Sequence, residues 1–193
     1  MEETKTIGKY KIEVIQDDNA SDPRGDDNLG TMVCFHSRYN LGDKHDYNHH
    51  NYDGWDDMEK NIIKDNNVGV ILPLYLYDHS GITMNTTGFS CGWDSGRVGF
   101  IFISKDKIRK EYGWKNLTKS RLAKIREYLK GEVETYDQYI KGDVYGYTIT
   151  DTETDEEVDS CWGYYGEDYC MKDATEIAEH FVEQDKQEQL EMK

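Results

Sequence analysis

Residues 144–164 read VYGYTITDTETDEEVDSCWGY, and this stretch decides the fold class. Aromatic and β-branched residues fill its two ends, Val144 to Thr150 and Glu157 to Tyr164, as is typical of strands. The residues between them, Asp151 to Asp155, are the polar types that form short hairpin loops. The stretch therefore predicts two antiparallel strands joined by a tight turn.

Four further segments have a strand composition and are bounded by Gly, Asp or Asn. Strands and helices do not alternate regularly along the chain, which favours an antiparallel arrangement over a doubly wound parallel sheet. The predicted strands are Tyr10 to Ile15, Thr31 to His36, Val68 to Tyr77 and Arg97 to Ser104.

One long helix is predicted from Thr118 to Lys141, where apolar residues recur at spacings of three and four. Shorter helices are predicted at Asp56 to Lys64 and Asp173 to Leu190, and a further one at Lys105 to Tyr112 is left open. The fold class is therefore α+β, a mainly antiparallel sheet packed by one long and two shorter helices. The length favours a single domain, residues 1–193, with a fraying tail at about 184–193.

The chain is strongly acidic, with 39 Asp and Glu against 23 Lys and Arg and a formal net charge of -16. Such a field repels phosphate backbones and anionic membranes, so neither nucleic acid nor membrane is expected as a direct partner. The favoured partner is a basic protein or a nucleic-acid-binding machine. Composition leaves the oligomeric state open.

The first residues lack the basic start and apolar core of a secretory signal, so none is expected, and the longest apolar run is too short to span a bilayer. A cytoplasmic location is expected. The four cysteines are expected to be free thiols because that compartment is reducing. They are Cys34, Cys91, Cys161 and Cys170.

Residues 34–50 contain several side chains that can bind a metal ion. Several competent ligands fall close together, but they lack the paired spacing of structural zinc sites, and HExxH is absent. No phosphate-binding glycine loop occurs either, so neither a metal nor a cofactor is expected. The ligands concerned are Cys34, His36, His45, Asp46, His49 and His50, partly on a long polar loop, 41–54, whose order in the free protein is left open.

Two polar runs at strand ends could form a ligand pocket. Asp78-His79-Ser80-Gly81 follows a strand, and Trp93-Asp94-Ser95-Gly96 precedes one. Such residues are ordinary turn formers, and GxSxG is missing, so no catalytic residue is assigned. The candidate ligand pocket comprises His36, Asp78, His79, Trp93 and Asp94.

Two segments pair a tryptophan with a cysteine, at Cys91-Gly92-Trp93 and at Ser160-Cys161-Trp162. The favoured interpretation is that both tryptophans are buried beside cysteines on neighbouring strands. The alternative is an aromatic pocket that stacks a base or another flat ligand.

Several runs resemble an uncharacterised family of proteins associated with phages, prophages and their bacterial hosts. They are DNLGTMVCFHSRYNLGDKH, LPLYLYDHSG, CGWDSG and DSCWGYYG, within residues 27–166. The family carries no established activity, so the resemblance implies no catalytic residues. It implies a setting in which small acidic proteins act as anti-defence factors.

The leading hypothesis is a non-enzymatic acidic binding protein, a phage-encoded inhibitor of a host defence or nucleic-acid-handling enzyme. The alternative is a small-molecule or nucleotide-binding protein, a sponge or a hydrolase, that uses the candidate ligand pocket. Carboxylates along the last predicted helix could occupy Lys and Arg sites that normally hold phosphates. This candidate acidic surface comprises Glu176, Glu179, Glu183 and Asp185.

Overall fold

The computed structural model describes residues 3–191, and residues 1, 2, 192 and 193 lie outside that range. The α+β class is confirmed, since four α-helices accompany eight strands in the described part of the chain. All strand pairs are antiparallel. The strands form two four-stranded sheets, a division that strand composition does not reveal because composition does not say which strands pair.

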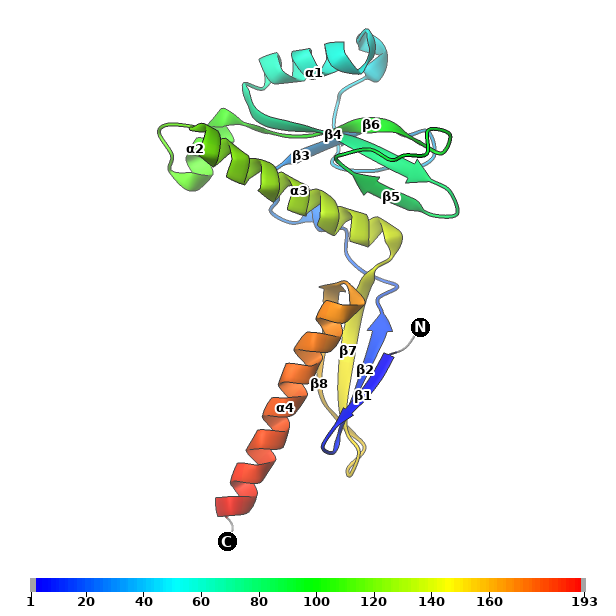
Figure 1. The fold of residues 1–193 in the computed structure, drawn as a ribbon, viewed down its shortest axis with the longest axis vertical. Helices are drawn as coiled ribbons and strands as arrows, with labels where there is room; N and C mark the ends of the chain where they lie inside the picture. Colours follow the sequence, from blue (N-terminus) through cyan, green and yellow to red (C-terminus); the bar gives the residue numbers. More distant parts are fainter. Residues whose placement is uncertain (1–2, 192–193) are drawn as a thin grey trace. The chain divides into compact units, whose positions relative to one another are not determined.

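The chain divides into two units, each with its own sheet (Figure 1). The terminal unit consists of Met1–Ser21 and Gln138–Lys193, and the central unit consists of Asp22–Asp137. That the two units behave as the single domain that the length favours stays a prediction, which the unfolding of variants confined to one unit would test.

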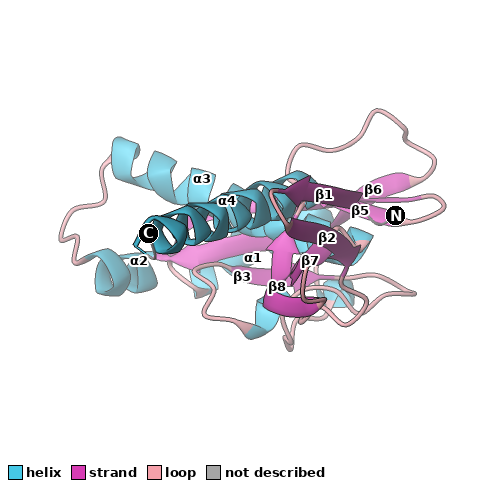
Figure 2. Ribbon diagram, turned by 90° about the horizontal axis from the view of Figure 1, so that it is seen from below, coloured by secondary structure: helices cyan, strands magenta, loops and turns pink. Residues whose placement is uncertain are grey.

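The sheet of the terminal unit runs in the order β1, β2, β7, β8, visible in Figure 2. The hairpin predicted from residues 144–164 is its β7–β8 pair, whereas β1 was not predicted. The unit also contains the longest helix, which continues through residues 184–191 of the predicted tail. Its elements are β1 (Glu3–Ile7), β2 (Tyr10–Gln16), β7 (Val144–Asp151), β8 (Glu156–Tyr165) and α4 (Glu167–Glu191).

Helix α4 packs closely on one face of this sheet. Small residues recur every four positions on its buried side, at Cys170, Ala174 and Ala178, and all three are fully buried. Their size lets the helix approach the sheet, where Ile12 and Ile149 are also fully buried. The terminal unit therefore has a core of its own.

The opposite face of the same sheet carries Trp162, which is half-exposed. Its indole lies over its cross-strand neighbour Gly146, where an added Cβ would come within 2.2 Å of the ring. Glycine at this position is what allows the ring to lie flat against the sheet. One face of this sheet is thus helix-covered and the other presents an aromatic ring.

The central unit has a sheet in the order β3, β6, β4, β5, with helices on both faces (Figure 1). On one face, Met58 and Ile62 of α1 pack against Phe100 and Phe102 of β6. Gly99 lets β3 and β6 pair closely, since a Cβ there would lie 1.9 Å from the Val33 carbonyl oxygen. The elements are β3 (Thr31–Cys34), α1 (Gly54–Asp65), β4 (Val68–Asp78), β5 (Ile82–Asn85), β6 (Ser95–Ser104), α2 (Lys105–Tyr112) and α3 (Lys119–Lys141), with short 3-10 turns at Pro23–Gly25 and His49–Asn51.

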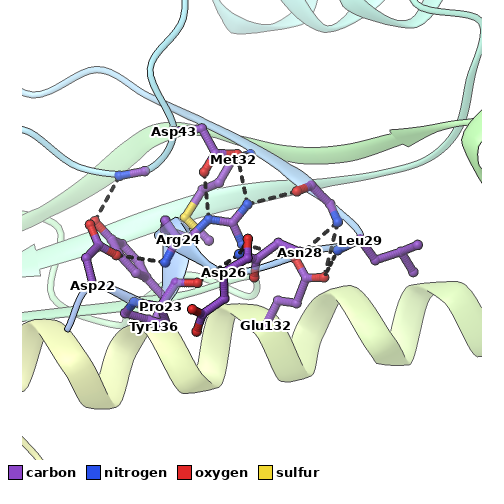
Figure 3. A network of polar contacts seen from close by, with 12 residues as sticks. Asp22, Pro23, Arg24, Asp26, Asn28, Leu29, Met32, Asp43, Glu132 and Tyr136 are labelled. Atoms are coloured by element: carbon purple, nitrogen blue, oxygen red, sulfur yellow. Dashed lines mark hydrogen bonds and ion pairs between the residues drawn. The ribbon is translucent and has the colours of Figure 1, made fainter. Parts of the chain in front are cut away.

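Helix α3 covers the other face, and a buried ion network ties the loops before and after β3 to the unit (Figure 3). The Arg24 side chain, only 4% exposed, donates to both carboxylate oxygens of Asp43 at 2.8 Å and to Glu132 of α3 at 3.1 Å. Glu132 also accepts the backbone N–H groups of Leu29 and Gly30. Each charge is therefore paired and hydrogen-bonded, the condition under which buried ions are tolerated.

Candidate functional site

The structure brings most of the predicted ligand-pocket residues together. His36, Asp78, Trp93 and Asp94 line one open hollow of about 440 Å³ in the central unit. The fifth residue, His79, lies beside it, with Nδ1 at 3.4 Å from the Asp94 carboxylate. Because β4 and β6 are hydrogen-bonded neighbours, the end of one and the start of the other meet at this hollow.

His36 is held by its surroundings at both ring nitrogens. Nδ1 accepts the backbone N–H groups of Arg38 and Tyr39, at 3.2 and 3.3 Å. The neutral ring therefore carries its proton on Nε2, which faces Asp78 at 3.7 Å. Because Nδ1 accepts two backbone N–H groups of the following residues, the His36 ring helps to position the loop after β3.

Three further polar side chains of the hollow, Asp78, Asp94 and Ser95, are also engaged. The Asp78 carboxylate contacts the guanidinium of Arg38, and the Ser95 hydroxyl donates to the backbone carbonyl of Cys91. Asp94 receives His79 on one side and the Cys91 thiol, at 3.9 Å, on the other. These contacts suit a rigid ligand-binding rim better than an activated nucleophile, which would need a serine or cysteine bonded directly to a base.

Arg97 is a residue of this hollow that the sequence reasoning missed. Its guanidinium lies 4.4 Å from the ring centroid of Phe100 and donates to Glu59 of α1 at 2.7 Å. Its Nε is buried and has no hydrogen-bond partner among the described residues. An arginine in the otherwise apolar strand Ser95–Ser104 was a signal that could have identified it.

A second hollow of about 590 Å³ shares Phe35 and His36 with the first. The Phe35 ring contacts His45, His49 and Trp55, with centroid distances of 4.9, 5.5 and 6.1 Å. His45 Nε2 lies 3.0 Å from the Cys34 carbonyl oxygen, and the buried Nδ1 has no partner in the described chain. Three or more metal-competent side chains do not converge anywhere within residues 3–191.

The interpretation that both tryptophans of the Cys-Trp segments are buried is wrong. Trp93 is 98% exposed, and Trp162 is 50% exposed. Trp93 is exposed because it lies in the loop before β6. Trp162 is half-exposed because it lies on the edge strand β8, on the face of the sheet that α4 does not cover. Exposed tryptophans are candidates for binding anchors.

The candidate acidic surface is only partly a single surface. Glu176, Glu179 and Glu183 are exposed on α4. Asp185, in contrast, is turned toward the sheet, where it accepts the Tyr10 hydroxyl at 3.0 Å and pairs with Lys9 at 3.2 Å. Hydrogen bonds to Asp151 and Asp185 raise the pKa of Lys9. Asp185 thus belongs to the helix–sheet contact and not to the exposed row.

The negative charge is distributed very unevenly between the two units. The terminal unit has 21 acidic and 7 basic residues, a net charge of -14, and the central unit has 18 and 16, a net charge of -2. The densest exposed acidic stretch lies on the β7–β8 hairpin and the edge strand β8, together with two half-exposed apolar side chains. This surface, called the acidic edge, comprises Glu153, Asp155, Glu156, Glu157, Val158 and Trp162.

Comparison with protein-family models, with curated proteins and with solved structures found no match for this chain. Among the described helices, none combines the length and the apolar character needed to cross a membrane.

Proposed function

We propose that this chain is a non-enzymatic binding protein whose terminal unit binds a positively charged protein. The observation that carries the proposal is the charge division: a net charge of -14 lies on the unit that also has an uncovered sheet face. Opposite charges steer association and raise its rate, and they discriminate against acidic partners.

The acidic edge is the part of this unit best suited to contact the partner. β8 is the last strand of its sheet, so its outer backbone groups are not paired with another described strand. Glu156 and Glu157 have no ion-pair partner within residues 3–191, which leaves them available to Lys and Arg side chains. Trp162 adds a large, half-exposed ring that can stack on a guanidinium.

The resemblance to phage-associated proteins indicates which partners to test first. A bacterial defence or nucleic-acid-handling enzyme has a basic groove that normally holds phosphates, and carboxylates can occupy the same Lys and Arg positions. The proposal is therefore an inhibitor that competes with nucleic acid for such a groove.

Charge reversal with a matched control tests this function. The double variant Glu156→Lys/Glu157→Lys alters the acidic edge, and Glu176→Lys/Glu179→Lys alters α4. Asp46→Lys/Asp65→Lys makes the same change in net charge on exposed positions of the central unit. Each tagged protein is used to capture partners from a bacterial lysate in about 0.1 M and about 1 M salt, where the screening length falls from about 10 to about 3 Å.

The expected result is a partner that the parent and the Asp46/Asp65 control retain in low salt, and that the acidic-edge variant loses. Retention should fail in high salt, and added nucleic acid should compete. Equal capture by all variants, or capture that survives high salt, would contradict the proposal. If only the α4 variant fails to capture the partner, the partner contacts Glu176, Glu179 and Glu183 instead of the acidic edge.

A second candidate function is the binding of a small anionic ligand in the 440 Å³ hollow of the central unit. The observation in its favour is that the hollow is lined both by Arg97, whose Nε is buried and unpartnered among the described residues, and by the exposed Trp93. Calorimetry against a nucleotide panel tests it, with Trp93→Ala expected to abolish binding and Trp162→Ala to leave it unchanged. Absence of heat with every nucleotide would remove this candidate.

A further inference from the structure

The most basic segment of the chain lies in the central unit, on α2 and the first part of α3. Residues 105–130 contain ten Lys and Arg and only three Asp and Glu. The rest of the chain contains 13 basic and 36 acidic residues, so the basic segment runs against the overall composition. This concentration sets the segment apart from both units as wholes.

Half of these ten cations are exposed and available to a partner. Two of the three acidic residues in the segment each pair with one cation: Asp106 with Arg109 at 3.0 Å and Glu127 with Lys130 at 2.8 Å. Five exposed cations have no ion-pair partner among the residues that the structure describes. One lies on α2, one between the two helices and three on α3. They are Lys110, Lys115, Lys119, Lys124 and Arg126.

Aromatic rings lie among these cations. Tyr112 and Trp114 stack at a centroid distance of 4.5 Å, and the Arg121 guanidinium lies 4.9 Å from the Trp114 ring. Tyr128 of α3 is 56% exposed. A small hollow of about 140 Å³ is lined by Lys107, Glu111, Tyr112 and Tyr128 among others, so α2 and α3 bring one cation, one carboxylate and two rings together there.

We propose that this basic aromatic surface binds single-stranded nucleic acid, a role beyond the proposed function of the terminal unit. Lysines and arginines release the counterions of phosphates, and exposed aromatic rings stack on unpaired bases. The net charge of -16 does not oppose this, since the screening length is about 8 Å at physiological salt. A strand on this surface therefore meets local cations, while more distant carboxylates are screened.

Fluorescence anisotropy with a labelled oligothymidylate tests the proposal on the full chain. The parent should bind in about 50 mM salt and lose affinity linearly as the logarithm of the salt concentration rises. The triple variant Lys115→Gln/Lys119→Gln/Lys124→Gln should bind at least about tenfold more weakly, with a salt slope flatter by about 2. Tyr128→Ala should weaken binding by about tenfold through lost stacking.

The control variant Lys44→Gln/Lys60→Gln/Lys64→Gln makes the same charge change on exposed lysines of the same unit, and it should bind like the parent. Replacement of Lys115, Lys119 and Lys124 by arginine should preserve binding. Circular dichroism verifies that each variant is folded.

The proposal is overturned if the parent does not bind the oligonucleotide in low salt, as expected of a surface built for an acidic protein. It is also overturned if the glutamine triple variant binds like its control, or if duplex DNA of equal length is preferred. The acidic-edge variant Glu156→Lys/Glu157→Lys should not weaken oligonucleotide binding. This arm distinguishes failure of the present inference from failure of the proposed function.

Discussion

The two units of this chain use opposite strategies of burial and charge. The central unit covers both faces of its sheet with helices and balances 18 acidic residues with 16 basic ones. The terminal unit packs one helix on one face of its sheet and has a net charge of -14. The comparison teaches that the acidity of the chain describes one unit, so arguments from net charge apply to that unit alone.

The cysteines offer the largest measurable contrast, because each unit contains one buried and one more accessible thiol. Burial raises the pKa of Cys34 in the central unit and of Cys170 in the terminal unit to about 12. Near pH 8, iodoacetamide should alkylate Cys161 at least about a thousandfold faster than either, since the buried thiols react only after the fold opens. Mass spectrometry of the peptides measures each rate.

The same thiols predict a pH dependence. Their pKa is higher in the folded chain than the ordinary thiol value of about 8.5, so folding favours the neutral form. The stability that they contribute is complete below the ordinary value and is lost as the pH rises toward about 12. Unfolding by denaturant should become easier over that alkaline range, and substitution of both cysteines by Ala should remove part of this dependence.

Arg24→Met should destabilise the central unit by about 3–5 kcal/mol, because it leaves the partly buried carboxylates of Asp43 and Glu132 without their buried countercharge. Arg126→Met, at an exposed position, should change stability by about 0.5 kcal/mol or less. Urea unfolding followed by circular dichroism measures both.

Alkylation of this variant then tests the single-domain prediction. If the chain unfolds as one cooperative domain, Arg24→Met accelerates the labelling of Cys34 and Cys170 equally. Acceleration confined to Cys34 would show that the two units unfold separately.

Ile149→Ala is the corresponding change in the terminal unit. Ile149 lies on β7 and is fully buried beneath α4. Its truncation should lower the free energy of unfolding by about 2–5 kcal/mol. Thr148→Ala, one residue earlier and on the other face of the sheet, should cost much less. An equal loss of stability in the two variants, measured by urea unfolding, would show that the core of this unit is not where the structure places it.

The smallest effect is expected at the two exposed tryptophans. Trp93→Ala should change stability by about 0.5 kcal/mol or less, because the side chain is 98% exposed. Trp162→Ala should cost about 1–2 kcal/mol, because half of its surface is buried against the sheet. Thermal unfolding measures both. A large loss at Trp93 would mean that its ring packs on the chain in solution.

The sequence predicted the hairpin at residues 144–164 and the helix from 118 to 141 because both depend on local patterns. It also placed His36, Asp78, Trp93 and Asp94 in one pocket, since turn residues at the ends of neighbouring strands meet at a sheet edge. It missed Arg97, whose significance depends on the apolar residues around it. The basic segment 105–130 was not predicted either, because the net charge of the whole chain conceals a local excess of Lys and Arg.

By itself, the sequence determined the α+β class, the strand and helix patterns and the total charge, because each follows from neighbouring residues or from composition. Tertiary structure alone decided that the strands form two sheets, since pairing joins residues as distant as Tyr10 and Asp151. It also decided which face of each sheet a helix covers. For that reason Trp162 is exposed and Asp185 is drawn inward to Lys9, although their local sequences indicated the reverse. Trp93 is exposed because the loop before β6 carries it away from the sheet.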